Sequence, residues 1–292
     1  MLTLLFCRNI FPRRGKLVCG HDLAQTYYMK FLYRKFPIWN KYIYSGYPYL
    51  AHPYNQFFYP LNLLFLLPIN YVYSISYIIH IFLAGAFMYL LTHSLLSSIC
   101  FMFSGFISNR LWAGHYEVLT TSIWIPLVFY FYITNHPVFC ALALTIQFFA
   151  GHNQTSWFTF LILLSYTIYK GGSWWILSEA NLMFLAFASI QLLPTMWFIR
   201  KSTRATGLPF KYSVYGSLPP SHLLRFFFPS ILGDYIERIL GEVSWEHTYY
   251  IGLIPLLLAL TFFNQQILWI LAICLVGELI FKILWRKNIL HI

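Results

Sequence analysis

Asp22 is one of two aspartates in the chain, and it lies in an aromatic stretch over residues 20–60. A carboxylate removes a proton from an acceptor hydroxyl when it lies within hydrogen-bond reach of that group. The same residue type caps helices, and Gln25 stands three residues later, as in a capping box. The two roles are compatible, because a cap fixes the direction of the carboxylate. From the residues alone the cap is the favoured interpretation of Asp22, and the base is the alternative.

Two predicted turns share the pattern Ala-Gly-His. Residues 113–117 read AGHYE and residues 150–154 read AGHNQ, and each segment lies between an apolar run and the next predicted helix. The recurrence predicts two tight turns that present His115 and His152 to one cavity. His152 has two interpretations, a polar turn residue or a donor to phosphate oxygens.

Glu117 follows His115 closely enough for both side chains to meet one cation. In that interpretation they bind a divalent ion, Mg²⁺ or Mn²⁺, that bridges to a substrate phosphate. In the alternative, Glu117 is an interfacial carboxylate paired with Arg110. One Glu and one His do not define a metal site, so the sequence leaves both interpretations open.

A basic cluster follows a long apolar run late in the chain. It comprises Arg200, Lys201, Arg204 and Lys211. A guanidinium suits bidentate contact with a phosphate, whereas a charge run at a helix end is also typical of unspecific contact with lipid headgroups. Further along, Glu246 precedes another apolar run, where it either completes a cavity wall or caps a helix.

The composition identifies the environment in which these residues act. Of 292 residues, 59% are hydrophobic and 9% are charged, whereas soluble proteins carry about 25% charged residues. Lipid is therefore the main solvent of the chain. The net charge of +11 favours anionic headgroups or a phosphorylated substrate. Nucleic acid is excluded as a partner, because no polar basic face lies outside the apolar runs.

An amphipathic helix over residues 23–36 is predicted to lie in the membrane interface, with Lys30 off its apolar face. Pro37 ends this helix, and residues 37–60 are predicted to be irregular. The shorter apolar runs that follow suggest helices that begin or end in a protein-lined cavity. Candidate membrane helices lie at 71–91, 95–108, 118–133, 138–150, 156–169, 174–199, 249–263 and 267–285.

These runs predict an all-α polytopic membrane protein with about eight spans and a single domain over residues 1–292. An interfacial loop covers 20–60, a helix bundle 71–199, a polar segment 200–248 and the final helices 249–285. Alternating the loops across the membrane places nearly all reactive side chains on one face, as in an enzyme that acts at one membrane surface. The residues assigned to substrate or phosphate binding are His52, Arg110, His115, His152, Arg200, Lys201, Arg204, His222 and Glu246.

Several segments in a fixed order together resemble a known family. They read KFPIWNKYIYSGYPYLAHPYNQFFYPLNLLF, SGFISNRLWAGHYEVLTTSIWIPL, FFAGHNQTSWFTFLILLSYTIY, LLPTMWFIRKSTRATGLPFKYSVYGSLPPSHLLRFFFPSILGD and WEHTYYIGLIPLLLAL. The series is similar to the YfhO-type family of bacterial membrane proteins, within the wider GT-C glycosyltransferases. The resemblance extends over most of residues 20–262.

The resemblance implies a GT-C-like helix bundle, a polyprenyl-phosphate sugar donor and an active site on the extracytoplasmic face of a prokaryotic cell membrane. In such enzymes an acid in the first outer loop is the base or a metal-associated carboxylate, and Asp22 matches that position. Glu117 corresponds more loosely to a second acid in the next outer loop. The family has a full membrane helix before the aspartate and is longer at its C-terminus, so we expect a fragment, a split gene product or a reduced homologue.

Two functions from different classes follow. The first is a membrane glycosyltransferase that moves one sugar from a polyprenyl-phosphate carrier to an extracytoplasmic glycan or a lipid-linked polymer. No glycine-rich phosphate loop follows a strand, which favours a lipid-borne donor over a soluble nucleotide. The second is a non-catalytic membrane protein that transports or assembles lipid-linked glycans.

Overall fold

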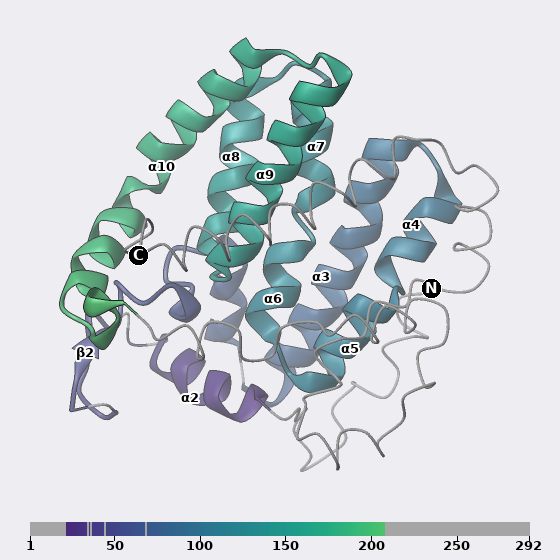
Figure 1. The fold of residues 1–292 in the computed structure, drawn as a ribbon. Helices are drawn as coiled ribbons and strands as arrows, with labels where there is room; N and C mark the ends of the chain where they lie inside the picture. Colours follow the sequence, from purple (N-terminus) through teal and green to yellow (C-terminus); the bar gives the residue numbers. More distant parts are fainter. Residues whose placement is uncertain (1–21, 34, 36, 44, 68, 208–292) are drawn as a thin grey trace, which may run out of the picture. The chain divides into compact units, whose positions relative to one another are not determined.

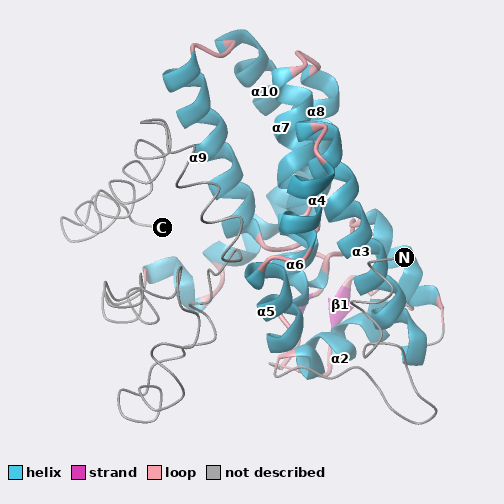
Figure 2. Ribbon diagram, turned by 90° about the vertical axis from the view of Figure 1, so that its right-hand side faces the viewer, coloured by secondary structure: helices cyan, strands magenta, loops and turns pink. Residues whose placement is uncertain are grey.

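The computed structural model of the chain describes residues 22–33, 35, 37–43, 45–67 and 69–207. Figures 1 and 2 show this part as mostly helical, with one short pair of strands. The chain divides into two compact units. The first comprises residues 1–103 and 110–198, and the second comprises residues 104–109 and 199–292. Most of the described helices lie in the first unit.

The aromatic stretch after Asp22 has a defined course. Helix α2 (Leu23–Tyr33) begins where the interfacial helix is predicted. Strand β1 (Trp39–Asn40) then pairs antiparallel with β2 (Tyr47–Pro48). Two 3₁₀ helices follow, η2 (Pro53–Asn55) and η3 (Pro60–Leu66), each with proline in its first turn. Proline suits this position because its φ is fixed and its missing N–H would make no intrahelical bond.

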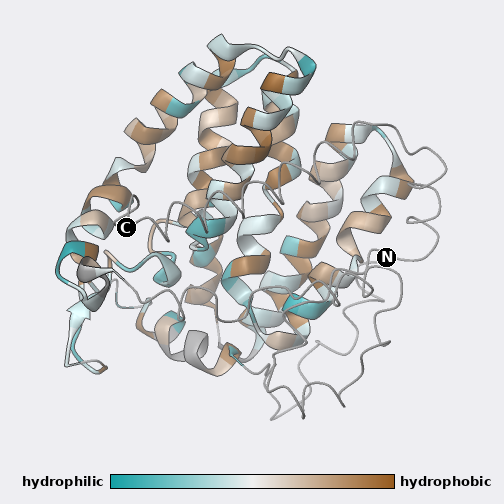
Figure 3. Cartoon of the chain, viewed as in Figure 1, coloured by the Kyte–Doolittle hydropathy of each residue, from teal (hydrophilic) through white to brown (hydrophobic). Residues whose placement is uncertain are grey.

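Within the described part, three helical segments are long and apolar enough to cross a membrane. Each coincides with an apolar run predicted from the sequence, and brown, apolar positions recur along them in Figure 3. The chain therefore has the character of an integral membrane protein. The segments are Tyr71–Thr92 in α3 (Ile69–Thr92), Tyr116–Ile133, which comprises α6 (Tyr116–Ser122) and α7 (Ile125–Ile133), and α10 (Trp174–Arg200).

The other predicted runs form shorter helices or lie outside the described residues. The run predicted over 95–108 is divided at Ser104, whose hydroxyl accepts from the Ile107 amide at 3.4 Å, a contact typical of a helix start. The runs predicted at 249–263 and 267–285 lie outside the described residues. The shorter helices are α4 (Leu95–Met102), α5 (Gly105–Ala113), α8 (Pro137–Phe149), α9 (Asn153–Lys170) and the 3₁₀ helix η4 (Thr203–Thr206).

A chain of buried hydrogen bonds fixes the aromatic stretch to the helices. The indole Nε1 of Trp124 donates to the Tyr59 hydroxyl at 3.1 Å, and that hydroxyl lies 2.8 Å from Nε2 of His80. Nδ1 of His80 lies 2.7 Å from the carbonyl oxygen of Ser76, which only accepts, so Nδ1 carries the proton and Nε2 accepts from Tyr59. These hydrogen bonds pair the Trp124 indole, the Tyr59 hydroxyl and the His80 ring with one another, which stabilises the loop against α3 and α7.

Apolar packing holds the helices of the first unit together. Helix α3 packs against α4 and α7, and α7 packs against α8. A buried core joins α7, α8, α9 and α10, with Val128, Cys140, Leu163 and Leu177 among its members. Figure 1 places the α3–α4, α7–α8 and α9–α10 connections at one end of these helices and α2 at the other. The reactive candidates come from segments at the α2 end.

Candidate functional site

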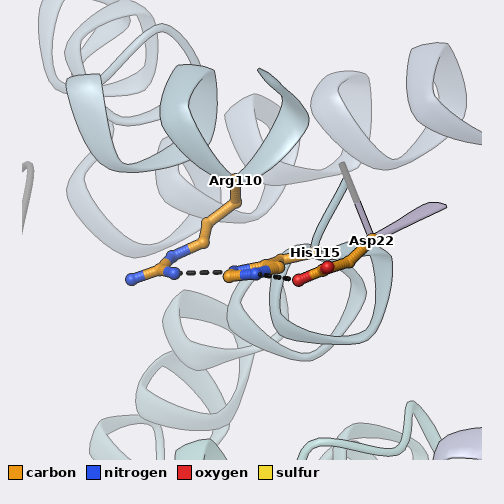
Figure 4. Close-up of polar contacts among 3 residues, drawn as sticks. All are labelled: Asp22, Arg110 and His115. Atoms are coloured by element: carbon orange, nitrogen blue, oxygen red, sulfur yellow. Dashed lines mark hydrogen bonds and ion pairs between the residues drawn. The ribbon is translucent and has the colours of Figure 1, made fainter. Parts of the chain in front are cut away.

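Asp22, His115 and Arg110 form a row of three polar side chains (Figure 4). Nε2 of His115 lies 2.9 Å from Oδ2 of Asp22, and Nδ1 of His115 lies 2.8 Å from a terminal nitrogen of Arg110. The Asp22 side chain is 55% exposed, whereas the His115 side chain is 15% exposed. An acid, an imidazole and a guanidinium thus meet with the carboxylate open to solvent.

The two neighbours of His115 fix where its proton lies. A guanidinium has donors only, so Nδ1 of His115 must accept from Arg110. The ring proton therefore sits on Nε2 and is donated to Asp22. In the part of the chain that the structure describes, no side chain donates to Oδ1 of Asp22.

The Ala-Gly-His segment at 113–115 ends α5 and aims the imidazole. Gly114 has a φ of +79°, a conformation that glycine adopts without strain. The His115 amide donates to the Arg110 carbonyl at 3.0 Å and the Gly114 amide donates to the Leu111 carbonyl at 3.3 Å, the two bonds of a Schellman motif. The Asp22 amide donates to the Ala113 carbonyl at 3.0 Å. Backbone contacts therefore hold both members of the pair.

The second Ala-Gly-His segment places His152 at the start of α9. Gly151 has a φ of +99°, and the His152 amide donates to the Thr121 hydroxyl at 3.1 Å. Nδ1 of His152 accepts from the Thr155 amide, so the imidazole caps the helix. Burial lowers the pKa of His152 to about 4, with further lowering by the nearby Arg110 and His115. His152 is thus a neutral side chain near Arg110 and His115.

The Tyr54 ring contacts the rings of both His52 and His152. The rings of His52 and Tyr54 meet edge to face with centroids 5.7 Å apart, and Tyr54 stacks on His152 at 6.1 Å. The His52 ring also meets Tyr47 edge to face. The predicted imidazoles at 52, 115 and 152 therefore come from three turns at one end of the first unit.

Glu117 is buried, and its electrostatic partner is Lys30. The predicted pairing with Arg110 is not the contact observed, because Arg110 meets His115. The prediction that Lys30 lies off the buried face of its helix is wrong. The Lys30 side chain is fully buried, and its Nζ donates to the Asn55 carbonyl at 3.1 Å and to Oε1 of Gln56. Helical periodicity does not reveal these partners, which come from another segment.

The described residues do not favour a cation at His115 and Glu117. Both ring nitrogens of His115 are engaged by Arg110 and Asp22, and Glu117 is buried beside Lys30. In the described ranges, no group of three or more His, Cys, Asp or Glu side chains is placed to hold a metal ion. We therefore assign no reaction step to a metal at these two residues.

The remaining candidate residues lie in the second unit, at the end of α10 and beyond, or outside the described residues. Arg200 and Lys201 are exposed at the end of α10, and Arg204 lies in η4. His222 and Glu246 lie outside the described residues. The structure therefore brings together Asp22, His52, Arg110, His115 and His152 from the set predicted for this site.

Comparison of the chain with protein family models, with curated proteins and with solved structures finds no match. The resemblance drawn from the sequence motifs therefore stays a prediction. The site itself offers one exposed carboxylate, one oriented imidazole and one guanidinium.

Proposed function

We propose that the chain is a membrane glycosyltransferase that moves a sugar from a polyprenyl-phosphate carrier to an extracytoplasmic glycan or a lipid-linked polymer. The row formed by Asp22, His115 and Arg110 is the observation that carries this proposal. A base for the acceptor hydroxyl and a donor to a departing phosphate are the two groups that this transfer requires.

Asp22 has the geometry of the base. Its Oδ2 accepts from His115, which orients the carboxylate, and Oδ1 is the oxygen that we assign to the acceptor. In the proposed step Oδ1 takes the proton of the acceptor hydroxyl, and the hydroxyl oxygen forms a bond to the anomeric carbon. The bond between that carbon and the donor phosphate oxygen breaks, and its electron pair leaves with the polyprenyl phosphate.

Arg110 supplies the positive charge for the departing phosphate. One terminal nitrogen contacts His115, and a guanidinium carries further donors in a rigid fork. Three helical segments of membrane length in the same chain support a donor that resides in lipid. The net charge of +11 also favours an anionic lipid carrier. A requirement for Mg²⁺ or Mn²⁺ stays a prediction of the family resemblance, which transfer with and without a chelator tests.

The proposal is tested by transfer in lipid nanodiscs. The chain is incubated with labelled polyprenyl-phosphate sugars and membrane glycan acceptors, and the labelled product is separated from the donor. Asp22→Asn is expected to lower the rate by roughly 10²-fold to 10⁴-fold, the contribution typical of a general base. Glu179→Gln on α10 is the matched carboxylate control and keeps the rate of the original chain. Unchanged transfer by Asp22→Asn would reject the assigned base, and no transfer with any donor would reject the function.

The buried pair of Lys30 and Glu117 favours one alternative, a non-catalytic protein for transport or assembly of lipid-linked glycans. Ionisable side chains buried among membrane helices are typical of transport pathways. The same Asp22→Asn variant separates the two functions. A transporter keeps its flux of labelled lipid across vesicle membranes, whereas the enzyme loses transfer while its lipid binding persists.

A further inference from the structure

Lys30 makes directional contacts in a setting that excludes water. Its side chain is fully buried, and the Nζ lies 5.4 Å from the ring centroid of Phe65 and 5.7 Å from that of Tyr116. The ammonium group donates to the Asn55 carbonyl at 3.1 Å and to Oε1 of Gln56. A buried ammonium is stable only when such acceptors are held in place, so Lys30 and the turn at Asn55 and Gln56 fix each other.

The Gln56 side chain also forms hydrogen bonds with two further segments. Its Nε2 donates to the Thr120 hydroxyl at 2.9 Å and to the Ala150 carbonyl. The Gln56 backbone has a φ of +53°, in the left-handed region that costs energy for a residue with a side chain. Strain of this kind persists where the surrounding contacts determine it, and it is common at functional sites.

The packing around Gly151 shows how closely the segments meet. A Cβ atom added to Gly151 would lie 2.8 Å from Cγ of Gln56 and 2.9 Å from the Pro53 carbonyl oxygen. The turn that carries His152 and the turn that carries His52 are therefore in direct contact through Gln56. Only glycine fits this approach, because the φ of +99° also excludes an ordinary side chain.

We propose that Lys30 and Gln56 are positioning residues that set the relative placement of the four segments carrying Asp22, His52, His115 and His152. Lys30 lies on α2, which begins after Asp22, and Gln56 follows η2, which begins after His52. Thr120 lies on α6, which begins after His115, and Ala150 precedes the turn of His152. The role assigned here rests on the proposed sugar transfer.

Lys30 and Gln56 hold the segments in place and do not contact the reacting atoms. One amide accepts from α2 and donates to α6 and to the α8–α9 turn, so it fixes three separations at once. A misplacement of about 1 Å costs roughly 10²-fold in rate. Loss of the amide should therefore lower kcat far more than it raises KM for the donor.

The first test compares Lys30→Met in a Glu117→Gln background with Glu117→Gln alone. Removal of both charges avoids an uncompensated buried carboxylate, which would destabilise the protein for an unrelated reason. Gln56→Glu is the second variant, because it keeps the acceptor for Lys30 and removes both donations by Nε2. Lys41→Met, at an exposed lysine of the β1–β2 loop, is the control.

Two readouts are measured on the full chain in nanodiscs. Steady-state transfer is expected to show kcat lowered by roughly 10²-fold in the Lys30 and Gln56 variants, with the KM for a polyprenyl-phosphate sugar within about threefold of its background. NMR of the labelled histidines follows the titration of His152. That side chain is expected to titrate at higher pH in both variants, because a loosened turn admits water to a ring whose pKa burial holds at about 4.

The outcomes separate this inference from the proposed function. Unchanged kcat in both variants, or an unchanged His152 titration in variants that remain folded, would overturn the positioning role and leave the sugar transfer standing. If the original chain transfers no sugar, the proposed function fails, and the His152 titration alone decides whether the pair positions the turns. Should Lys30→Met fail to fold in the Glu117→Gln background, Gln56→Glu decides through the same two readouts.

Discussion

Nε2 of His115 donates to Oδ2 of Asp22 over 2.9 Å, across a separation of 93 residues in the sequence. The Asp22 side chain is 55% exposed, and exposed pairs of this kind contribute only about 0.2–1 kcal/mol to stability. The pair therefore adds little to the fold. Its geometric effect is larger, because it gives an exposed carboxylate one direction. Substitutions in this row should change chemistry more than stability.

His115 should be replaceable only by a side chain that both accepts and donates. In His115→Gln the amide oxygen accepts the hydrogen bond from Arg110, and the amide nitrogen donates one to Asp22. His115→Phe loses both hydrogen bonds. We expect kcat for transfer to fall by about tenfold in the first variant and by roughly 10²-fold in the second. Steady-state kinetics in nanodiscs measure the difference. His93→Gln, at the exposed end of α3, is the control, and equal losses in the Gln and Phe variants would contradict the orienting role.

Arg110 should act on the donor through the shape of its guanidinium as well as its charge. Lysine keeps the charge but presents no rigid fork, and methionine loses both. We expect the KM for the polyprenyl-phosphate sugar to rise by about tenfold in Arg110→Lys and by about 10²-fold in Arg110→Met. Transfer rates measured over a series of labelled-donor concentrations give these KM values. Identical KM values for the original chain and Arg110→Met would remove Arg110 from donor binding.

His152 should make the protein less stable in acid. Its pKa in the folded protein is about 4, below the ordinary value of 6.5, because of burial and the neighbouring Arg110 and His115. Between these pH values the unfolded chain binds a proton that the folded protein does not. The free energy of unfolding therefore falls as the pH drops from about 6.5 to about 4, by at most roughly 3 kcal/mol.

His152→Asn isolates this contribution. Asparagine accepts at a helix start as the imidazole does but has no proton to gain. Thermal unfolding at about pH 7 and about pH 5 should show a larger loss of stability in the original chain than in the variant. A variant that loses as much stability in acid as the original chain would mean that His152 is already protonated or exposed.

Local signals in the sequence were sufficient for several elements. Length and apolarity predict the helical segments Tyr71–Thr92, Tyr116–Ile133 and Trp174–Arg200, because these properties are set within each segment. The Ala-Gly-His recurrence predicts two turns, and both glycines have a positive φ. The break at Ser104 was missed, since one hydroxyl within an apolar run does not change its average hydropathy.

Contacts between distant segments limited the prediction of the site. Alternation of loops predicts that Asp22 and His115 share a membrane face, but it does not predict which nitrogen of His115 meets which oxygen. Lys30 is predicted to lie off the apolar face, although it follows the buried Leu23 by seven residues, about two helical turns, and so lies close to it on the helix. Its burial depends on acceptors from Asn55 and Gln56, which become visible only when the loop after α2 is folded back on that helix.

Gly151 gives the sharpest test of how closely the His52 and His152 turns meet. Gly151→Ala puts a Cβ atom 2.8 Å from Cγ of Gln56 and 2.9 Å from the Pro53 carbonyl oxygen, at a φ of +99°. Gly171→Ala is the matched control, because Gly171 also has a positive φ but nothing within 4 Å of the added atom.

The control should lose about 1 kcal/mol for the backbone conformation alone. Gly151→Ala should lose about 2–4 kcal/mol, because overpacking against a carbonyl oxygen adds to that cost. Denaturant unfolding of both variants in one detergent measures the difference. Equal losses would show that the two turns separate without cost, and the close contact through Gln56 would then not hold the imidazoles in place.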